Sequence, residues 1–333
     1  IFSSVGAPDV TLIKVQPGQT LNEALKGISG SVEIQLPPGV TEHTAPITRE
    51  ETVVIRGHGM ELSTLRPAAD VPLVVQGDLN KPFAGDLTLR DFTYDRVYRH
   101  VGDAGAVVLS NAGGRVVFRN IRTLHFNFNG RLTPFFLGLG PAVHRVHLRS
   151  AEEIDKTPRH NYVGFHNFHI DFKSGGGIRN RHNSRTGSGT LVFNADRFVF
   201  DKESVFQGHL TQHADPAQTV GEPPQGRGNA GGLGALAFNI WEYGLVDGTL
   251  REVDYSTVRY GGVVTADGVL EIRCRAIDCG FADQFWCRAY LPQLNGHLIY
   301  DGLVLTSADG NPWHDRGIYA IGSWKTVTVR NCY

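Results

Sequence analysis

The sequence contains little sulfur and no long apolar run. Its 333 residues include one Met and four Cys, and the Cys residues form no Cys-x-x-Cys pair of the kind that zinc sites use. We therefore expect no metal site, and we expect Cys274 and Cys332, which fall within repeated strands, to be buried free thiols. No apolar stretch approaches the length that spans a bilayer, so we expect no membrane partner.

Charge of neither sign dominates the chain. Lys and Arg together number 32 and Asp and Glu together number 33, which gives a formal net charge of −1. No global field draws such a chain to nucleic acid or to a membrane surface, so recognition of any anion must be local. The 40 Gly residues suit a protein of short strands and frequent turns.

Short strands recur at a nearly constant interval. Apolar-x-apolar strands, each followed by a polar or glycine-containing bend, begin at Val53, Leu87, Val116, Val163, Leu191, Leu270, Leu298 and Val327. The interval is 29 residues from Leu87 to Val116, and 28 residues from Val163 to Leu191 and again from Leu270 to Leu298. A period in the twenties that is built from strands predicts stacked coils. Two longer intervals predict insertions near 122–162 and 201–262, which in a solenoid form the binding side.

The first thirty residues predict a cap. Thr20 and Glu23 have the spacing of a capping box, and the apolar residues that follow lie on one helical face, so we expect a short amphipathic helix. We expect a single domain over 1–333, with the cap at 1–30 and coils over 31–333. No cap follows the last strand, so we expect a further segment, or a partner subunit of a homo-oligomer, to cover it.

Residues 31–67 contain the segments VEIQLPPGV, TVVIRGHG and STLRP. These segments, with the helix before them, resemble the opening coils of the pectate lyase-like family of right-handed parallel β-helices, and the repeated strands extend the likeness over most of the chain. The resemblance implies an all-β fold: a right-handed parallel β-helix with a short N-terminal capping helix. It also implies a polysaccharide ligand in a lateral groove and an extracellular or periplasmic location. This family contains lyases, glycosidases, esterases, epimerases and tailspikes, so the fold alone does not select an activity.

Residues 144–185 are rich in Arg, Lys and His. β-Elimination of a uronate requires cations that neutralise the carboxylate, a base for the C5 proton and an acid for the leaving oxygen. We predict Lys173, Arg179 and Arg181 for neutralisation. Proton transfer is assigned to Tyr162, His166 and His182, and substrate contacts to His147 and Arg185. An alternative for His166 is a solvated bend residue, because it occupies the repeat position of Arg90 and Arg119.

The segment FKSGGGIRNRHN is similar to the Lys-Ser and Arg-His pattern of chondroitinase B and alginate lyases. We expect no cofactor; calcium is the alternative, and no motif in the sequence supports it.

A second, acidic and aromatic set favours a different reaction. Paired carboxylates on neighbouring coils are what a glycoside hydrolase of this fold needs, and the candidates are Glu242, Asp254 and Asp267. Trp241, Tyr243, Trp313 and His314 are candidate sugar-binding residues. Asp at strand ends also caps turns, which is the structural interpretation of the acidic residues. We predict a polysaccharide lyase; the alternatives are a glycoside hydrolase and a non-catalytic tailspike-like or adhesin-like module.

Overall fold

We analysed a computed structural model of the chain. The structure describes residues 9–68, 71, 73–76, 85–95, 107–109, 114–124, 160–171, 190–207, 209–210, 232–233, 235–251, 263–264, 268–277, 284–287, 296–306, 319–322 and 324–333.

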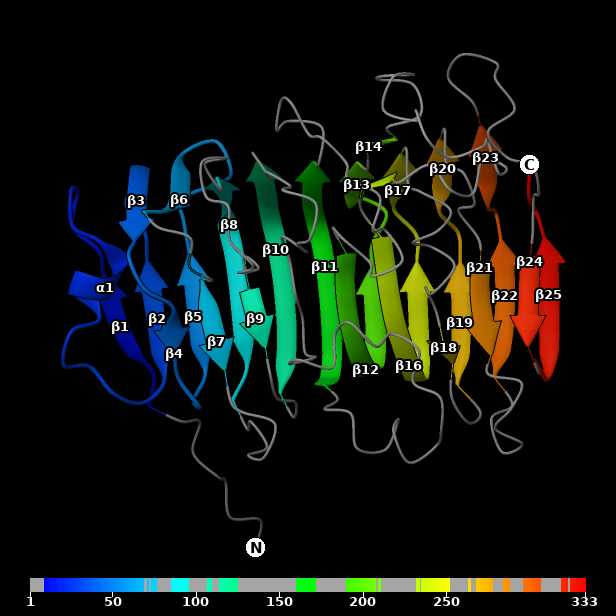
Figure 1. Ribbon diagram of the computed structural model, residues 1–333, viewed down its shortest axis with the longest axis horizontal. Coiled ribbons are helices and arrows are strands. Elements are labelled where there is room, and N and C mark those ends of the chain that lie inside the picture. The colour runs from blue at the N-terminus through cyan, green and yellow to red at the C-terminus, as the bar shows by residue number, and fades with distance from the viewer. Residues whose placement is uncertain are drawn as a thin grey trace, which may run out of the picture.

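Parallel strands stack side by side along one axis, from the helix α1 (Leu21–Ala24) at one end to β25 (Thr326–Arg330) at the other (Figure 1). A first row of strands runs the whole length and comprises β1 (Thr11–Lys14), β2 (Val32–Gln35), β5 (Val53–Arg56), β8 (Leu87–Asp95), β10 (Arg115–Leu124), β11 (His160–Asp171), β12 (Thr190–Phe200), β16 (Ala235–Val246), β19 (Val269–Ile272), β22 (His297–Asp301) and β25. The chain is therefore an all-β parallel β-helix, and the predicted fold class is confirmed.

Further strands complete the coils. After the first bend lie β3 (Gly39–His43), β6 (Ser63–Pro67), the second parts of β8, β10 and β11, then β13 (Val205–Gln207), β17 (Thr249–Arg251), β20 (Arg275–Ile277) and β23 (Val304–Thr306). Other parallel strands are β4 (Ile47–Thr48), β7 (Val74–Gln76), β9 (Val107–Leu109), β18 (Val263–Val264), β21 (Gln284–Cys287) and β24 (Tyr319–Gly322). β14 (His209–Leu210) and β15 (Gly232–Leu233) form an antiparallel pair.

Alternation along each strand builds the core. In β2 and β5 buried residues alternate with half-buried ones, as expected for strands with one face inside. Parallel pairing places like side chains above one another, so that Ile34, Ile55, Leu89, Phe118 and Phe165 follow in register. The Phe118 and Phe165 rings stack with their centroids 5.1 Å apart. These ladders belong to one hydrophobic cluster that extends from Ile13 to Leu303.

The bends contain Asp and Asn residues whose backbone is in the left-handed region. Asp91, Asn120 and Asn167 have φ of 64°, 51° and 49°. Asn167 Nδ2 donates to Asn120 Oδ1 at 3.0 Å, and Asn120 Nδ2 donates to Asp91 Oδ1 at 2.7 Å. Asn and Asp tolerate this conformation, and here their side chains also join successive coils. Asn331 instead donates to Asp301.

One predicted register is wrong. The 28-residue interval predicts that Leu191 is equivalent to Val163, but Val163 pairs with Phe198, and Leu191 pairs with Leu236 of β16. The reason is that β12 is a long strand that takes part in two rows. Its apolar start belongs to the row before the first one, so an apolar-x-apolar pattern alone does not identify the row.

The two ends of the coil stack differ. The predicted capping box is confirmed: Glu23 N–H donates to Thr20 Oγ1 at 3.3 Å, and Thr20 N–H donates to Glu23 Oε2 at 2.8 Å. Leu21 is buried, and Leu25 and Ile28 pack against the core. At the other end the inward residues of β25 are open, with Val327 45% and Val329 51% exposed. The expected cover of this end, and the single domain over 1–333, stay predictions.

Cys274 and Cys332 are free thiols, as predicted. Cys274 is buried, but Cys332 is only half-buried because it lies in the uncovered last coil.

His160 at the start of β11 is a buried histidine that lacks the hydrogen bonds that usually accompany burial. It is 1% exposed, neither ring nitrogen has a hydrogen-bond partner among the described residues, and burial lowers its pKa to about 4. An unfolded His titrates near 6.5, so between about pH 6.5 and about pH 4 the unfolded chain binds the extra proton. The free energy of unfolding should therefore fall as the pH drops through that window, by about 3 kcal/mol at most at about 1.4 kcal/mol per pKa unit.

Denaturant unfolding at a series of pH values measures this effect. We expect His160→Leu to lose this part of the pH dependence, and His58→Leu, at an exposed histidine, to retain it. Equal pH slopes in both variants would contradict the assignment.

Candidate functional site

The outward side chains of the first strand row form a ridged face across β10, β11, β12 and β16. The strand register aligns them in parallel rows. The outer row, before the bend, contains Arg115, Tyr162, Arg197 and Tyr243. The middle row contains Val117, Gly164, Val199 and Leu245. The bend row contains Arg119, His166, Asp201 and Asp247. Asp201 and Asp247 lie just after their strands, and their backbone N–H groups continue the hydrogen bonding between coils. A mostly apolar strip therefore lies between two polar rows.

Three side chains of this face form a hydrogen-bonded chain, which we name the Tyr–His–Asp relay. Tyr162 Oη lies 3.0 Å from His166 Nε2, and His166 Nδ1 lies 3.2 Å from Asp201 Oδ2. The Tyr162 and His166 rings are stacked, with 14° between their planes. His166 and Asp201 are each about one quarter exposed, so the relay is open to a ligand.

Asp201 is held in place by a backbone N–H and by a buried hydroxyl group. Its Oδ1 accepts the Asn167 N–H at 3.1 Å and the Ser204 hydroxyl at 2.8 Å. Ser204 is fully buried, and its Oγ also accepts the Phe168 N–H at 3.0 Å. The bend of one coil thus fixes the carboxylate that orients His166 on the neighbouring coil.

Gly164 makes the contact between Tyr162 and His166 possible. It lies between them in β11, so all three positions point to the same side of the strand. A Cβ at Gly164 would come within 2.5 Å of Tyr162 Cε1, 2.6 Å of Tyr162 Oη and 2.7 Å of His166 Nε2. The two rings lean together over the space that a side chain would fill.

The partners determine where the protons lie. The Asp201 carboxylate can only accept, so His166 carries its proton on Nδ1. Burial raises the pKa of Tyr162, and the Arg115 and Arg119 guanidinium groups offset this in part, so the phenol keeps its proton at neutral pH. Tyr162 therefore donates to His166 Nε2, and His166 donates to Asp201.

Positive charge flanks the relay. The Arg115 guanidinium lies 5.0 Å from the centre of the Tyr162 ring, and Arg119 pairs in register with His166. Both arginines are exposed, and within the described part of the chain neither forms an ion pair. An anionic group placed over the relay would meet both of them.

The structure brings together two of the predicted proton-transfer residues, Tyr162 and His166. The prediction missed Asp201, Gly164 and Arg115. The prediction missed Asp201 because it assigned the wrong register to β12. Phe165 pairs with Phe200, so the next residue, Asp201, aligns with His166. Trp241 and Tyr243 of the predicted sugar-binding set lie in β16. The other predicted residues of the lyase and sugar-binding sets lie outside the described residues: His147, Lys173, Arg179, Arg181, His182, Arg185, Trp313 and His314.

The predicted hydrolase set is only partly visible. Asp254 and Asp267 lie outside the described residues. Glu242 follows Trp241 where β16 holds an extra residue relative to β12, and Glu242 forms an exposed ion pair with Arg197 at 3.2 Å. Exposed pairs of this kind contribute little stability.

Tyr243 belongs to a second polar cluster further along the same face. Its hydroxyl donates to Glu271 Oε2 at 2.8 Å, and Arg273 donates to Glu271 Oε1 at 2.9 and 2.6 Å. Burial and the bond to Glu271 raise the pKa of Tyr243 to about 12. Burial also raises the pKa of the neighbouring Asp247 carboxyl, and Arg273 offsets part of that shift.

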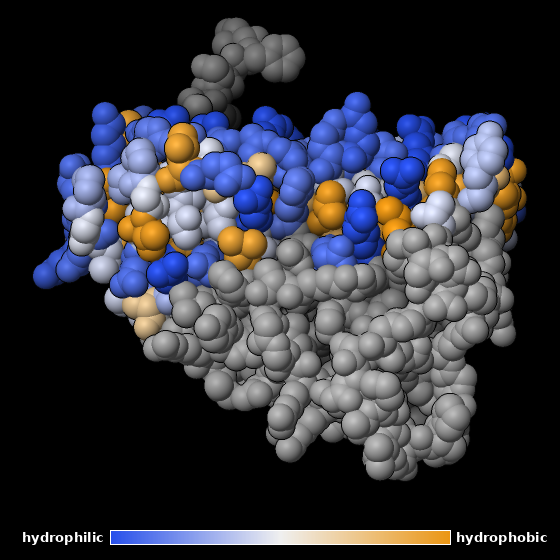
Figure 2. Space-filling view, turned by 90° about the horizontal axis from the view of Figure 1, so that it is seen from above, coloured by the Kyte–Doolittle hydropathy of each residue, from blue (hydrophilic) through white to orange (hydrophobic). Residues whose placement is uncertain are grey.

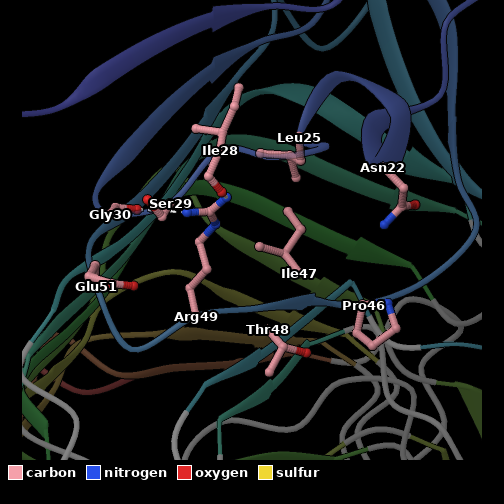
Figure 3. A pocket seen from close by; sticks show the side chains of 10 residues that line it. All are labelled: Asn22, Leu25, Ile28, Ser29, Gly30, Pro46, Ile47, Thr48, Arg49 and Glu51. Carbon is pink, nitrogen blue, oxygen red and sulfur yellow. Dashed lines mark hydrogen bonds between the residues drawn. The ribbon is translucent and has the colours of Figure 1, made fainter.

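A pocket of about 340 Å³ opens beside α1 (Figure 3). Its main polar side chains already hold the cap together. Arg49 reaches across to donate to the carbonyls of Ile28 and Gly30 at 2.6 and 2.8 Å, and Asn22 Oδ1 accepts the Thr44 and Ala45 N–H groups. Because Arg49 and Asn22 are already engaged in hydrogen bonds within the cap, we assign this pocket to the packing of the cap and not to a ligand site.

Figure 2 shows a mainly hydrophilic surface over the coloured residues, with hydrophobic side chains in small separate patches. Among the described residues no group of three His, Cys, Asp or Glu is arranged to hold a metal, and no described helix is long and apolar enough to cross a membrane. Comparison with protein-family models, curated proteins and solved structures found no match to this chain.

Gly164→Ala should separate Tyr162 from His166 while leaving the fold intact. The added methyl meets the ends of two side chains that can rotate away, and Gly164 has no positive φ. Nitrogen NMR of the imidazole should show His166 Nε2 accepting a hydrogen bond in the parent chain but not in the variant. Val199→Ala, next to Gly164 in the middle row, should leave the spectrum unchanged. An unaltered His166 signal in Gly164→Ala would show that the glycine does not control the contact.

Proposed function

We propose that the protein is an enzyme that cleaves a uronate-containing polysaccharide by β-elimination. The observation that carries the proposal is the Tyr–His–Asp relay with Arg115 and Arg119 beside it. The parallel β-helix supports it as well, because a rod presents a long lateral face to a polymer. So does the resemblance of the opening coils to the pectate lyase-like family. A polymer substrate of this kind places the enzyme outside the cytoplasm.

The arginines prepare the substrate. A uronate carboxylate bound between Arg115 and Arg119 is neutralised by two guanidinium groups, which acidifies the adjacent C5–H bond. As the C5 proton departs, negative charge moves onto the carboxylate, where the same guanidinium groups stabilise it. Further cations from the predicted set of Lys173, Arg179 and Arg181 add to this effect if they reach the same face.

The relay moves the proton. Tyr162 Oη takes the C5 proton while its own proton passes to His166 Nε2, and the Asp201 carboxylate stabilises the imidazolium that forms. A phenol with a raised pKa is a poor source of free phenolate, so the transfer to His166 must accompany the abstraction. The C5–H electrons become the C4–C5 double bond, and the C4–O bond breaks toward the leaving oxygen. The leaving oxygen takes a proton from the His166 imidazolium, which returns His166 to its neutral form.

A second candidate is hydrolysis by paired carboxylates. Asp201 and Asp247 follow the same ladder on neighbouring coils, and strands in register lie about 4.8 Å apart, close to the separation of about 5–5.5 Å in retaining glycosidases. Burial raises the pKa of Asp247, which suits a general acid. In this mechanism Asp201 serves as nucleophile, and Tyr162 is dispensable.

The two reactions give different products. We expect a panel of uronate polymers to yield, for one of them, a product with the ultraviolet absorbance of an unsaturated uronate. Tyr162→Phe and His166→Ala should each lower kcat by at least about 100-fold with little change in KM, because they remove proton transfer. His169→Gln is the matched control, since His169 lies on the same strand but after the bend and contacts the Glu203 carbonyl. Chelation of metals should leave turnover unchanged, because we expect no cofactor.

Other outcomes overturn the proposal. New reducing ends without absorbance, abolished by Asp247→Asn but not by Tyr162→Phe, would establish the hydrolase. Binding of the polymer with neither product would establish a non-catalytic glycan-binding module.

A further inference from the structure

Charge on the bend row changes sign at the relay. On the coils between α1 and the relay the row contains cations and one amide, which we name the basic strip: Lys14, Gln35, Arg56, Arg90 and Arg119. From Asp201 of the relay toward β25 it contains Asp201, Asp247, Arg273, Asp301 and Arg330.

The basic strip has more cations than carboxylates to pair with them. Glu33 lies 2.7 Å from Arg56 and 3.7 Å from Arg90, so one carboxylate serves two guanidinium groups. Asp91 lies 3.6 Å from Arg90, but its other oxygen accepts from Asn120. Lys14 and Arg119 are exposed and form no ion pair within the described part of the chain. The strip therefore retains positive charge at both of its ends.

Beyond the relay the balance is reversed. Arg273 is bound to Glu271 at 2.6 Å, and Arg330 to Asp301 at 2.9 Å, so both guanidinium groups are paired. Asp247 has no cation within ion-pair distance among the described residues, and it is half-buried. An anionic ligand lying over these coils meets carboxylates and no free cation of this row.

We propose that a linear polyanionic saccharide binds with its charged residues along the basic strip, so that it extends from the relay toward α1 and not toward β25. This rests on the proposed function for the class of ligand. Parallel coils repeat at about 4.8 Å, so the strip offers a cation or amide at each such step, and a ligand whose carboxylates recur at a similar interval can pair with several of them at once. The residue at the relay is then the last charged one on the chain, and the enzyme acts at one end of a run of uronates.

Binding can be measured apart from turnover. In the Tyr162→Phe chain, calorimetry with oligouronates of increasing length should give an affinity that rises with length until the ligand spans the strip. Adding Arg119→Gln should weaken binding by about tenfold, as expected for a lost charge-assisted hydrogen bond, and should reduce the dependence on salt. Arg330→Gln is the matched control: the same residue type in the same row on the other side, expected to change affinity less than twofold.

Each alternative result has a clear meaning. Equal losses in Arg119→Gln and Arg330→Gln would overturn the proposed direction, as would tight binding of a neutral oligosaccharide of equal length. Equal affinity for single-stranded DNA would overturn recognition of a saccharide. Strip-dependent binding without any product from the parent chain would support the strip and contradict the lyase. Product formation with unchanged binding in Arg119→Gln would contradict the strip and the role of Arg119 in neutralising the carboxylate, but not β-elimination itself.

Discussion

The structure depends on in-register stacking of parallel strands. Each coil buries its inward residues against the same positions of the next, as in the series from Ile34 through Phe118 to Phe165, and the backbone ladder fixes the register. A side chain cannot shift along such a stack without moving its whole strand. The same constraint that builds the core therefore places outward residues of distant segments at defined neighbouring positions.

The relay is a direct product of this constraint. Tyr162 and His166 are close in sequence, but they meet only because Gly164 leaves the space between them open. Asp201 is 35 residues from His166 and reaches it because its coil stacks directly on that of β11. Its own orientation depends on the buried Ser204 hydroxyl at the bend. The candidate site thus uses the scaffold itself as the support for its reactive groups.

The polar bends serve two purposes. Asn120 and Asn167 adopt the left-handed backbone that turns the chain, and their amides bond from coil to coil. The residues just before them, Arg119 and His166, point outward and carry charge or proton-transfer chemistry. A pair of adjacent residues therefore repeats along the rod. The second residue is a structural asparagine, and the first carries a functional side chain that differs from coil to coil.

The sequence alone determined the fold class, the capping helix and most of the ladder. Periodic apolar pairs and the Thr20–Glu23 spacing are local patterns, and local patterns are what a sequence displays directly. It also singled out Tyr162 and His166, since both lie in one strand. Only the tertiary structure decided that Asp201 aligns with His166, whereas the fixed interval in the sequence equates Leu191 with Val163. The reason is that β12 takes part in two rows, so its register depends on pairing with β11 and β16. It likewise decided the change of charge along the bend row, which arises from residues far apart in the chain and exists only once the coils are stacked.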